Sequence, residues 1–367
     1  MKILFDLAGR FQDSSITVYA KRLLAGFSEN HYKDIYVLCS PEIYDDIKKS
    51  FPEYTCIKLN QVYKRLSFFR HIFTCRSLVK KTDYDLILSP HPIPSYCLWL
   101  NHKRYVTIFH DLLRLRIDKG RLLWKHRLMY ITALIKSRKI IAISENVKDD
   151  ILRTYRFVPA NKITVIYNGI NIKPACSKEE PFLQQKYLLY ISTLMEYKNV
   201  LTLLKAFNIL RNDISHSLVI IGRSTPYWEE KVLPYIKKNN LQDRVIHMSN
   251  RIDDKTLSQY YQHASLFIHP SLHEGFGYTP IEAAIHEIPV LSSKTTALYE
   301  TTMGLLNYYE SATDERAMAE KIKILLQNPP SAERLKEISL TLQKQYDNKQ
   351  QAKKIYTFLK DVYQQNL

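Results

Sequence analysis

Residues 269–300 read HPSLHEGFGYTPIEAAIHEIPVLSSKTTALYE and hold two carboxylates, Glu274 and Glu282, with seven residues between them. Gly275 and Gly277 follow the first carboxylate. Glycine adopts backbone conformations that other residues avoid, and it lets a ligand approach the main chain closely. This loop therefore offers a carboxylate together with accessible backbone amides.

The second carboxylate is expected on a helix. Pro280 stands where a helix can begin, because its missing N–H costs nothing at the first helical position. Glu282 would then lie in the first turn, where negative charge suits the helix dipole. Carboxylates accept hydrogen bonds from hydroxyls, and helix N-termini bind anions, so the stretch suits a ligand with both hydroxyl and phosphate groups.

Apolar segments of strand length alternate with amphipathic segments of helix length through the rest of the chain. This alternation predicts an α/β fold with parallel sheets and helices on both faces, and a length of 367 residues favours two domains. The expected strands are 2–5, 35–39, 55–59, 86–89, 105–109, 140–143, 187–192, 218–222, 244–248, 266–269 and 289–292. The expected helices are 16–27, 43–49, 62–80, 122–135, one opening at Ser144, 199–210, 253–263 and a helical tail from 315, broken at Pro329-Pro330.

Ligands of parallel sheets bind at the carboxyl ends of the strands. His110-Asp111 directly follows the expected strand 105–109, and Gly9 lies in the loop after the first strand. Asp83 and Asp85 instead precede a strand, so we interpret them as a surface turn and expect no metal there.

The order Pro270-Ser271, Glu274-Gly275-Phe276-Gly277, Glu282 resembles the signature of glycosyltransferase family 4. The resemblance implies the GT-B fold, with two Rossmann-like domains facing a cleft and a C-terminal helix that crosses back to the first domain. It assigns residues 1–172 to acceptor binding, 173–345 to the nucleotide sugar and 346–367 to the crossing helix, with a linker near 173–181.

The same resemblance implies a role for each matching residue. Glu282 would hold the ribose, and Glu274 with the amides of Phe276 and Gly277 would hold the hydroxyls of the sugar. Thr193 replaces an arginine that many family members use for the diphosphate. For the diphosphate, the remaining assignments are Lys198, Arg223 and the amides near Gly9. Ile252 would contact the base, and Gly275 and Tyr278 would contact the donor. His110 would lie beside the sugar, and His110 and Glu274 would be the catalytic residues.

The implied reaction moves a hexosyl group (mannose-, rhamnose- or glucose-like) from a nucleotide-diphosphate sugar to an acceptor hydroxyl, with retained configuration and no metal or cofactor. The departing phosphate would take the acceptor proton; Glu274 as a covalent nucleophile is the alternative step. Four other functions stay open: a nucleotide-sugar epimerase, a polysaccharide synthase, a nucleic-acid-binding protein and a non-enzymatic lectin-like module.

The net charge of +17 lies almost entirely in the first half, where residues 1–173 hold 30 lysines and arginines against 15 acids. Segments 61–81 and 114–139 interleave basic and aromatic residues, which fits an anionic membrane surface or, alternatively, nucleic acid or a plain core-facing stripe. The membrane interpretation implies a lipid-linked or oligosaccharide acceptor, as in O-antigen (lipopolysaccharide) or capsule assembly, with no nucleic acid as partner. Five cysteines without CxxC spacing and the lack of a signal peptide predict a cytoplasmic protein, held at the inner membrane face.

Overall fold

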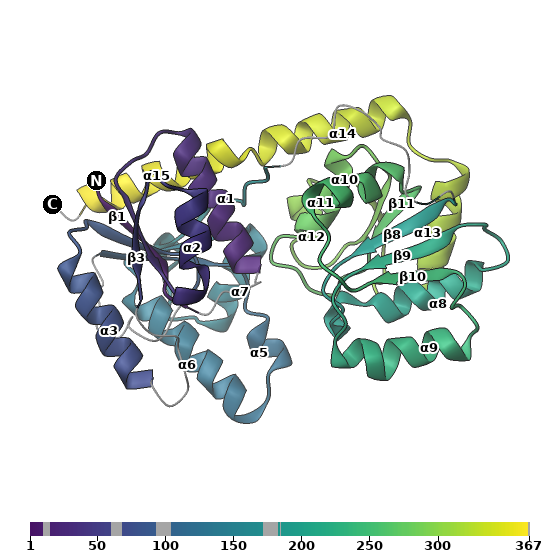
Figure 1. Cartoon of the computed structure of the whole chain (residues 1–367). Coiled ribbons are helices and arrows are strands. Elements are labelled where there is room, and N and C mark those ends of the chain that lie inside the picture. The colour runs from purple at the N-terminus through teal and green to yellow at the C-terminus, as the bar shows by residue number, and fades with distance from the viewer. Residues whose placement is uncertain (10–14, 60–67, 93–103, 172–182, 184, 366–367) are drawn as a thin grey trace. The chain divides into compact units, whose positions relative to one another are not determined.

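The computed structural model describes residues 1–9, 15–59, 68–92, 104–171, 183 and 185–365, with the side chains of 68–74 left out. The chain forms two compact units (Figure 1). Unit 1 comprises Met1–Asn171 and Tyr346–Leu367, and unit 2 comprises Ile172–Gln345. The expected linker at 173–181, the start of the helix expected at 62–80, Cys97 and Cys176 lie outside the described residues.

Unit 1 is built on a parallel sheet, which in its described part has seven strands in the order β3-β2-β1-β4-β5-β6-β7. The central strands β1, β4 and β5 are buried along their whole length, as expected for continuous apolar segments covered on both faces. The strands are β1 (Ile3–Leu7), β2 (Ile35–Cys39), β3 (Thr55–Lys58), β4 (Leu86–Ser89), β5 (Tyr105–Phe109), β6 (Lys139–Ala142) and β7 (Ile163–Val165).

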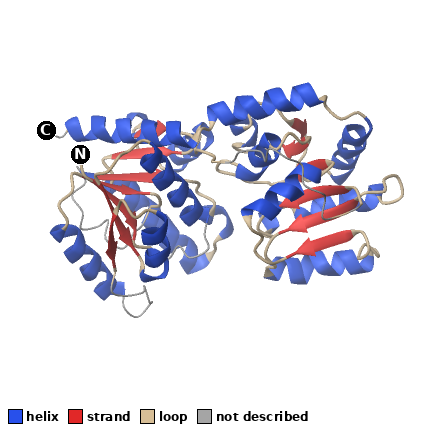
Figure 2. Cartoon of the chain, turned by 45° about the horizontal axis from the view of Figure 1, so that its top comes forward, coloured by secondary structure: helices blue, strands red, loops and turns tan. Residues whose placement is uncertain are grey.

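The helices of unit 1 lie on both faces of this sheet (Figure 2). Ser144 caps one of them as its position predicts, because its Oγ accepts a hydrogen bond from the Val147 amide at 3.2 Å. These helices are α1 (Ser15–Glu29), α2 (Pro41–Ser50), α3 (Phe68–Lys81), α5 (Arg114–Ile117), α6 (Gly120–Lys136), α7 (Glu145–Thr154) and α15 (Asn348–Gln364).

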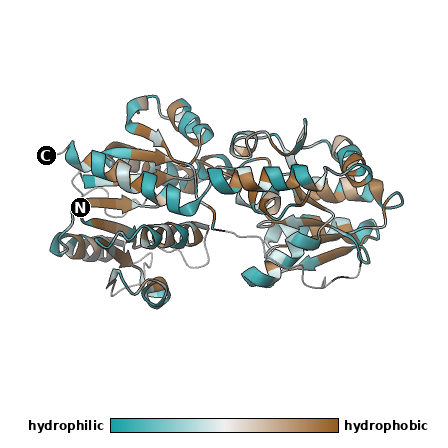
Figure 3. Ribbon diagram, turned by 90° about the horizontal axis from the view of Figure 1, so that it is seen from above, coloured by the Kyte–Doolittle hydropathy of each residue, from teal (hydrophilic) through white to brown (hydrophobic). Residues whose placement is uncertain are grey.

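Unit 2 repeats the same architecture, and over its described residues the sheet has the order β10-β9-β8-β11-β12-β13. Most of its strands are apolar, whereas its helices carry both hydrophobic and hydrophilic residues on their surfaces (Figure 3). Two helices, α8 and α13, pack Leu203, Phe207, Met318 and Ile322 into one core. The strands are β8 (Tyr187–Ile191), β9 (Ser217–Ile221), β10 (Val245–Met248), β11 (Leu266–His269), β12 (Val290–Ser293) and β13 (Asn307–Tyr309). The helices are α8 (Val200–Leu210), α9 (Leu233–Lys238), α10 (Asp254–His263), α11 (Tyr278–Ile285), α12 (Leu298–Thr301), α13 (Glu315–Gln327) and α14 (Ala332–Gln345).

The predicted α/β class with two parallel sheets is confirmed, but two local predictions were wrong. Helix α11 begins at Tyr278 rather than Pro280, so Glu282 lies in the second turn instead of the first. Pro280 is still tolerated, because the first amides of a helix have no intrahelical partner. The segment 295–300, expected as a loop, partly forms α12. None of the helices within the described residues is long and apolar enough to cross a membrane.

The C-terminal helix α15 packs against α1 through a glycine contact. A Cβ at Gly26 would come within 2.7 Å of both Ala352 Cβ and the Asn348 carbonyl oxygen. Asn348 Nδ2 donates a hydrogen bond to the Arg22 carbonyl at 2.7 Å, which ties the start of α15 to α1. Position 26 therefore has to be glycine for the two helices to approach this closely.

We expect Gly26→Ala to lower the free energy of unfolding of the protein by about 1–3 kcal/mol, because the added methyl group overpacks the α1–α15 contact. Denaturant unfolding followed by circular dichroism measures this. Val18→Ala is the matched control, since Val18 lies on the same helix with 51% of its surface exposed, and it should change stability by less than about 0.5 kcal/mol. A Gly26→Ala protein as stable as wild type would contradict the contact.

Candidate active site

Four neighbouring strands of unit 2 deliver the predicted donor-binding residues to one edge of the sheet. The sheet order places β10, β9, β8 and β11 side by side and parallel. Ile252 follows β10, Arg223 follows β9, Lys198 follows β8 and Glu274 follows β11. All four positions therefore lie beyond the carboxyl ends of the strands, where α/β sheets bind ligands.

Glu274 is the centre of a compact polar network. Its Oε1 accepts a hydrogen bond from Lys198 Nζ at 2.5 Å and another from His269 Nε2 at 2.9 Å. The backbone amide of Glu274 donates to Thr296 Oγ1 at 2.9 Å. The side chains of Glu274 and Lys198 are only 12% and 14% exposed, so this ion pair is largely shielded from water.

These contacts determine the protonation state of the network. An ionised carboxylate only accepts hydrogen bonds, so His269 Nε2 is the donor to Glu274, and the Thr279 hydroxyl lies 3.2 Å from Nδ1 on the other side of the ring. Burial alone would raise the pKa of Glu274, but the Lys198 charge and the His269 hydrogen bond outweigh it, and the pKa lies well below its usual range. Glu274 is therefore a carboxylate at every physiological pH.

The turn after Glu274 requires glycine at its last position. Gly277 has φ +84°, and a Cβ there would come within 2.5 Å of Leu298 Cδ2. The backbone on its N-terminal side is also anchored, because the Thr301 hydroxyl donates to the Phe276 carbonyl at 2.5 Å. Gly275 and Phe276 are buried, and the Phe276 and Tyr278 rings pack with centroids 5.0 Å apart. The turn is thus rigidly placed at the start of α11.

Glu282 lies on α11 with 7% of its surface exposed. Its Oε2 accepts a hydrogen bond from the Tyr261 hydroxyl at 3.4 Å, and its backbone carbonyl accepts one from His286 Nδ1 at 2.8 Å. Burial lowers the pKa of His286, so the ring is neutral near pH 7. The two glutamates of the quoted stretch therefore lie in different environments: Glu274 beside a cation, Glu282 beside a tyrosine.

The loops that carry Lys198 and Arg223 are tied together. A Cβ at Gly222 would meet the Ser192 carbonyl oxygen at 2.0 Å, and the Thr225 hydroxyl donates to the Leu194 carbonyl. Arg223 is exposed, as is Thr193, the residue that replaces the arginine of other family members. The structure therefore places Arg223 on the loop adjoining that of Lys198, as the sheet order requires.

The remaining predicted residues belong to unit 1. Gly9 follows β1 and His110 follows β5, at the carboxyl ends of strands that flank β4. His110 Nε2 donates to the Pro90 carbonyl at 2.8 Å, and its ring meets Tyr19 edge-on with centroids 4.7 Å apart. Burial lowers the pKa of His110, so the ring is uncharged at neutral pH.

Sequence reasoning assigned no role to several residues of these networks. They are His269 and Thr279 behind Glu274, Thr296 at its amide, Tyr261 beside Glu282, and Asp6 in unit 1. His269 had a detectable signal, since it ends a strand five residues before Glu274. Tyr261 had none, because only folding brings α10 beside α11.

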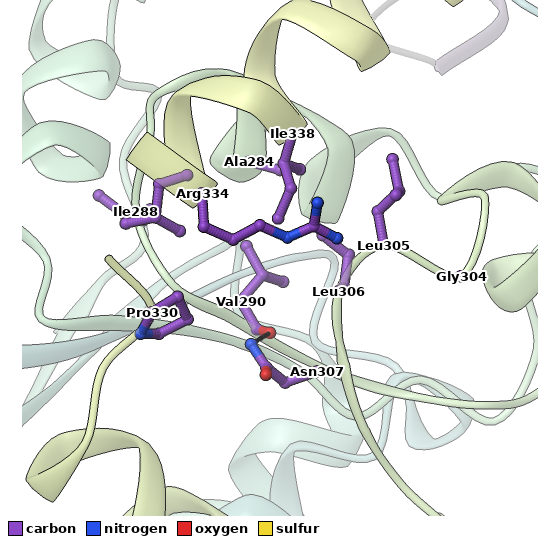
Figure 4. Close-up of a pocket in the computed structure, with 11 residues that line it drawn as sticks. Ala284, Ile288, Val290, Gly304, Leu305, Leu306, Asn307, Pro330, Arg334 and Ile338 are labelled. Carbon is purple, nitrogen blue, oxygen red and sulfur yellow. Dashed lines mark hydrogen bonds between the residues drawn. The ribbon is translucent and has the colours of Figure 1, made fainter. Parts of the chain in front are cut away.

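A cavity of about 270 Å³ lies elsewhere in unit 2, between α14, the end of α11 and the loop before β13 (Figure 4). Most of its lining residues are apolar, but polar and apolar atoms contribute equally to its walls, with Arg334 and Asn307 as polar side chains. Arg334 is already paired with Glu337 at 2.7 Å. The predicted site residues do not line this cavity.

Two family models match the chain, one after the other. The model described as Glycosyltransferase Family 4 matches residues 16–173, and the model described as Glycosyl transferases group 1 matches residues 173–340. The chain belongs to glycosyltransferase family 4. The residues quoted above for the resemblance fall within the second of these matches, and the predicted family is confirmed.

Individual relatives agree with this family. The chain is 29% identical over 200 residues to the O-antigen chain mannosyltransferase RfbU of Salmonella typhimurium, an alignment that covers 54% of each protein. It is 28% identical over 272 residues to the capsular polysaccharide biosynthesis glycosyltransferase CapM of Staphylococcus aureus, covering 68% of each. Only about half the length of RfbU is therefore matched by this chain.

Solved structures match the fold over nearly the whole chain. Sucrose-phosphate synthase from Thermosynechococcus elongatus has a TM-score of 0.80 at 18% identity and 99% coverage of both chains. Anabaena HepE in complex with UDP and glucose has a TM-score of 0.76 at 16% identity, covering 98% of this chain and 100% of its own. This family 4 chain thus has the predicted GT-B fold.

We expect Lys198→Met to lower the free energy of unfolding by about 3 kcal/mol at pH 7, because it leaves the buried Glu274 charge with His269 as its nearest partner. The depressed pKa of Glu274 stabilises the fold above its unfolded pKa near 4.5, and this contribution is lost as pH falls below that value. The destabilisation by Lys198→Met should therefore shrink on acidification. Thermal or denaturant unfolding at pH 4 and pH 7 measures it.

Lys323→Met is the control for this prediction. Lys323 pairs with Asp213 at 2.7 Å, but both side chains are nearly half exposed. An exposed pair contributes less than about 1 kcal/mol. Equal effects of the two substitutions would contradict the importance of the Glu274 network.

Proposed function

We propose that the protein transfers a hexosyl group from a nucleotide-diphosphate sugar to an acceptor hydroxyl with retention of configuration. Unit 2 binds the donor and unit 1 binds the acceptor. The observation that carries the proposal is the Lys198–Glu274–His269 network at the carboxyl ends of β8 and β11. It provides a permanent carboxylate for sugar hydroxyls and a cation for phosphate in adjacent positions.

The carboxylate has an oxygen suited to the sugar. Lys198 and His269 both donate to Oε1, so Oε2 is the atom that accepts from a hydroxyl of the transferred sugar. The turn that follows presents the amides of Phe276 and Gly277, and Gly277 holds this turn in a conformation that other residues avoid. Glu282, beside Tyr261, accepts from the ribose hydroxyls in the same way.

The chemical step places negative charge on the leaving diphosphate as the bond from the anomeric carbon to the phosphate oxygen breaks. Lys198 stabilises that charge, with Arg223 on the adjoining loop as a second cation. The acceptor oxygen forms the new bond to the anomeric carbon, and its proton passes to the departing phosphate. The reaction therefore needs no separate protein base. Gly9 offers its amide to the diphosphate, and Ile252 contacts the base.

The relatives suggest which substrates to test first. RfbU is named an O-antigen chain mannosyltransferase and CapM a capsular polysaccharide glycosyltransferase. We propose a mannose-, rhamnose- or glucose-like donor sugar and a lipid-linked saccharide of surface-polysaccharide assembly as acceptor. Thermal shift with a panel of nucleotide sugars tests the donor, since a bound ligand raises the melting temperature.

We expect Glu282→Ala to weaken binding of the donor found in that panel by about 10- to 100-fold, since a hydrogen bond to a charged group contributes about 1.5–3 kcal/mol. Isothermal titration calorimetry with the nucleotide sugar measures the change. Glu320→Ala, an exposed glutamate on α13 of the same unit, should bind the donor like wild type. Unchanged binding by Glu282→Ala would remove the ribose role, and no binding to any nucleotide sugar would remove the function.

We also propose that helix α6 docks on an anionic membrane surface on the cytoplasmic side, where a lipid-linked acceptor lies. Its buried side, which includes Met129 and Leu134, packs on unit 1, yet Trp124 and Leu128 on another side are 67% and 66% exposed. Residues 120–136 contain Arg121, Lys125, Arg127 and Lys136 and no acid. A simple core-facing stripe does not explain the exposed apolar residues, whereas interfacial binding uses both features.

We expect the double substitution Trp124→Ser and Leu128→Ser to reduce binding to vesicles of phosphatidylcholine and phosphatidylglycerol at least about tenfold, because two large apolar side chains no longer enter the interface. Vesicle sedimentation at low and high salt measures it, and wild-type binding should weaken with salt. Leu340→Ser on α14, also exposed at 57%, is the control. Two results would contradict this docking surface: wild-type protein that does not bind the vesicles, or a double variant that binds them as well as wild type.

A further inference from the structure

Unit 1 also contains a buried carboxyl group, that of Asp6, at the carboxyl edge of its sheet. Asp6 belongs to β1 and is fully buried, and the neighbouring strand β4 ends at Ser89. Asp6 Oδ1 accepts a hydrogen bond from the Ala8 amide at 3.0 Å, and Asp6 Oδ2 lies 3.2 Å from Ser89 Oγ. Asp6 thus touches both the loop that leads to Gly9 and the loop that follows β4.

The number of protons in this cluster determines how it is bonded. Ser89 Oγ also lies 2.6 Å from the His91 carbonyl oxygen, which only accepts hydrogen bonds. A hydroxyl has one proton to donate, and the shorter of the two contacts of Ser89 Oγ, 2.6 Å against 3.2 Å, is the one to the His91 carbonyl. Both contacts are satisfied together when Asp6 is protonated, because Asp6 Oδ2 then donates to Ser89 Oγ and Ser89 donates to His91.

The surroundings of Asp6 favour this neutral form. Burial raises the pKa of Asp6 to about 7, although the hydrogen bonds that Ala8 and Ser89 can donate to the ionised carboxylate oppose the shift. The titratable groups that interact with it are the thiols of Cys39 on β2 and Cys75 on α3. The contact with Cys56 and burial raise the pKa of Cys39, and burial raises that of Cys75. These thiols are therefore uncharged near pH 7. Among the described residues around Asp6, no lysine or arginine acts on the carboxyl in the way that Lys198 acts on Glu274.

The loop after β4 connects Asp6 to His110. Ser89 holds the His91 carbonyl from one side, and His110 Nε2 donates to the Pro90 carbonyl at 2.8 Å from the other. We propose that protonated Asp6 is a positioning residue, which fixes the Ser89–His91 loop and through it the orientation of His110. The inference rests on the proposed role of His110 beside the transferred sugar, and it adds a residue with no contact to substrate.

Ionisation of Asp6 would release the loop. The Ser89 proton then turns to the carboxylate, and the bond to the His91 carbonyl is lost. The loop segment that carries the Pro90 carbonyl, the partner of His110, then loses this anchor. We expect transfer activity to fall above neutral pH through kcat rather than KM, by about tenfold between pH 6 and pH 8 for one group that titrates near 7. Burial lowers the pKa of His110, so a loss of activity above neutral pH is not expected from this ring itself.

The decisive variant is Asp6→Asn, because an amide reproduces the protonated carboxyl: its oxygen accepts from Ala8 and its nitrogen donates to Ser89. We expect Asp6→Asn to keep the activity that wild type shows at pH 6 and to retain it at pH 8. Ser89→Ala, which cuts the link, should have uniformly lower kcat with no alkaline loss. Asp83→Asn is the control, since Asp83 is exposed at the opposite end of β4 and should leave the wild-type profile unchanged.

A readout independent of activity separates this inference from the proposed function. In protein labelled with ¹⁵N-histidine, the His110 ring signal, assigned with His110→Gln, should shift with a midpoint near pH 7 in wild type and stay constant in Asp6→Asn. If no nucleotide sugar is a substrate, this titration still tests the coupling. The proposal would be overturned if the His110 signal of the wild type stayed constant from pH 6 to pH 8. It would also be overturned if Asp6→Asn still lost transfer activity above neutral pH as the wild type does. If Asp6→Asn does not fold, Ser89→Ala provides the same test.

Discussion

The buried charge of Glu274 is the constraint on which the arrangement of unit 2 at the carboxyl edge of its sheet depends. A carboxylate with little access to water is costly unless it is paired and hydrogen-bonded. Lys198 and His269 meet that requirement, and they come from the loop after β8 and from the end of β11. The same contacts hold the glycine turn that leads into α11. Neutralising one charge therefore fixes the positions of three chain segments at the edge of the sheet.

Unit 1 stabilises a buried carboxyl group in the opposite way. Within the described part of the chain, Asp6 is bonded to a backbone amide and a hydroxyl and not to a cation. Burial consequently raises its pKa, whereas the cation beside Glu274 lowers the pKa of that group. One carboxyl is kept charged, as its proposed role as a hydrogen-bond acceptor for the sugar requires. The other is kept neutral near pH 7, so its protonation can influence the loop that holds His110.

Much of the fold was predictable because it depends on local pattern. Alternating apolar and amphipathic segments give the parallel strands and helices directly, and Ser144 marks the start of α7 as a capping residue should. The short elements were missed: α5 has four residues and β7 and β13 have three each, too few to show a periodicity. The start of α11 was misplaced by two residues, because the left-handed conformation of Gly277, and not Pro280, sets it.

The sequence by itself determined the family, the α/β class and the residues at the carboxyl ends of the strands, since these follow from residue order and spacing. Tertiary structure alone decided which of those residues meet. Strand order places Lys198 against Glu274, although 76 positions separate them, and Ser89 against Asp6 across 83 positions. Protonation depends on those contacts and on burial. The sequence therefore shows which carboxyl groups are present, but only the folded sheet determines which of them carries a charge.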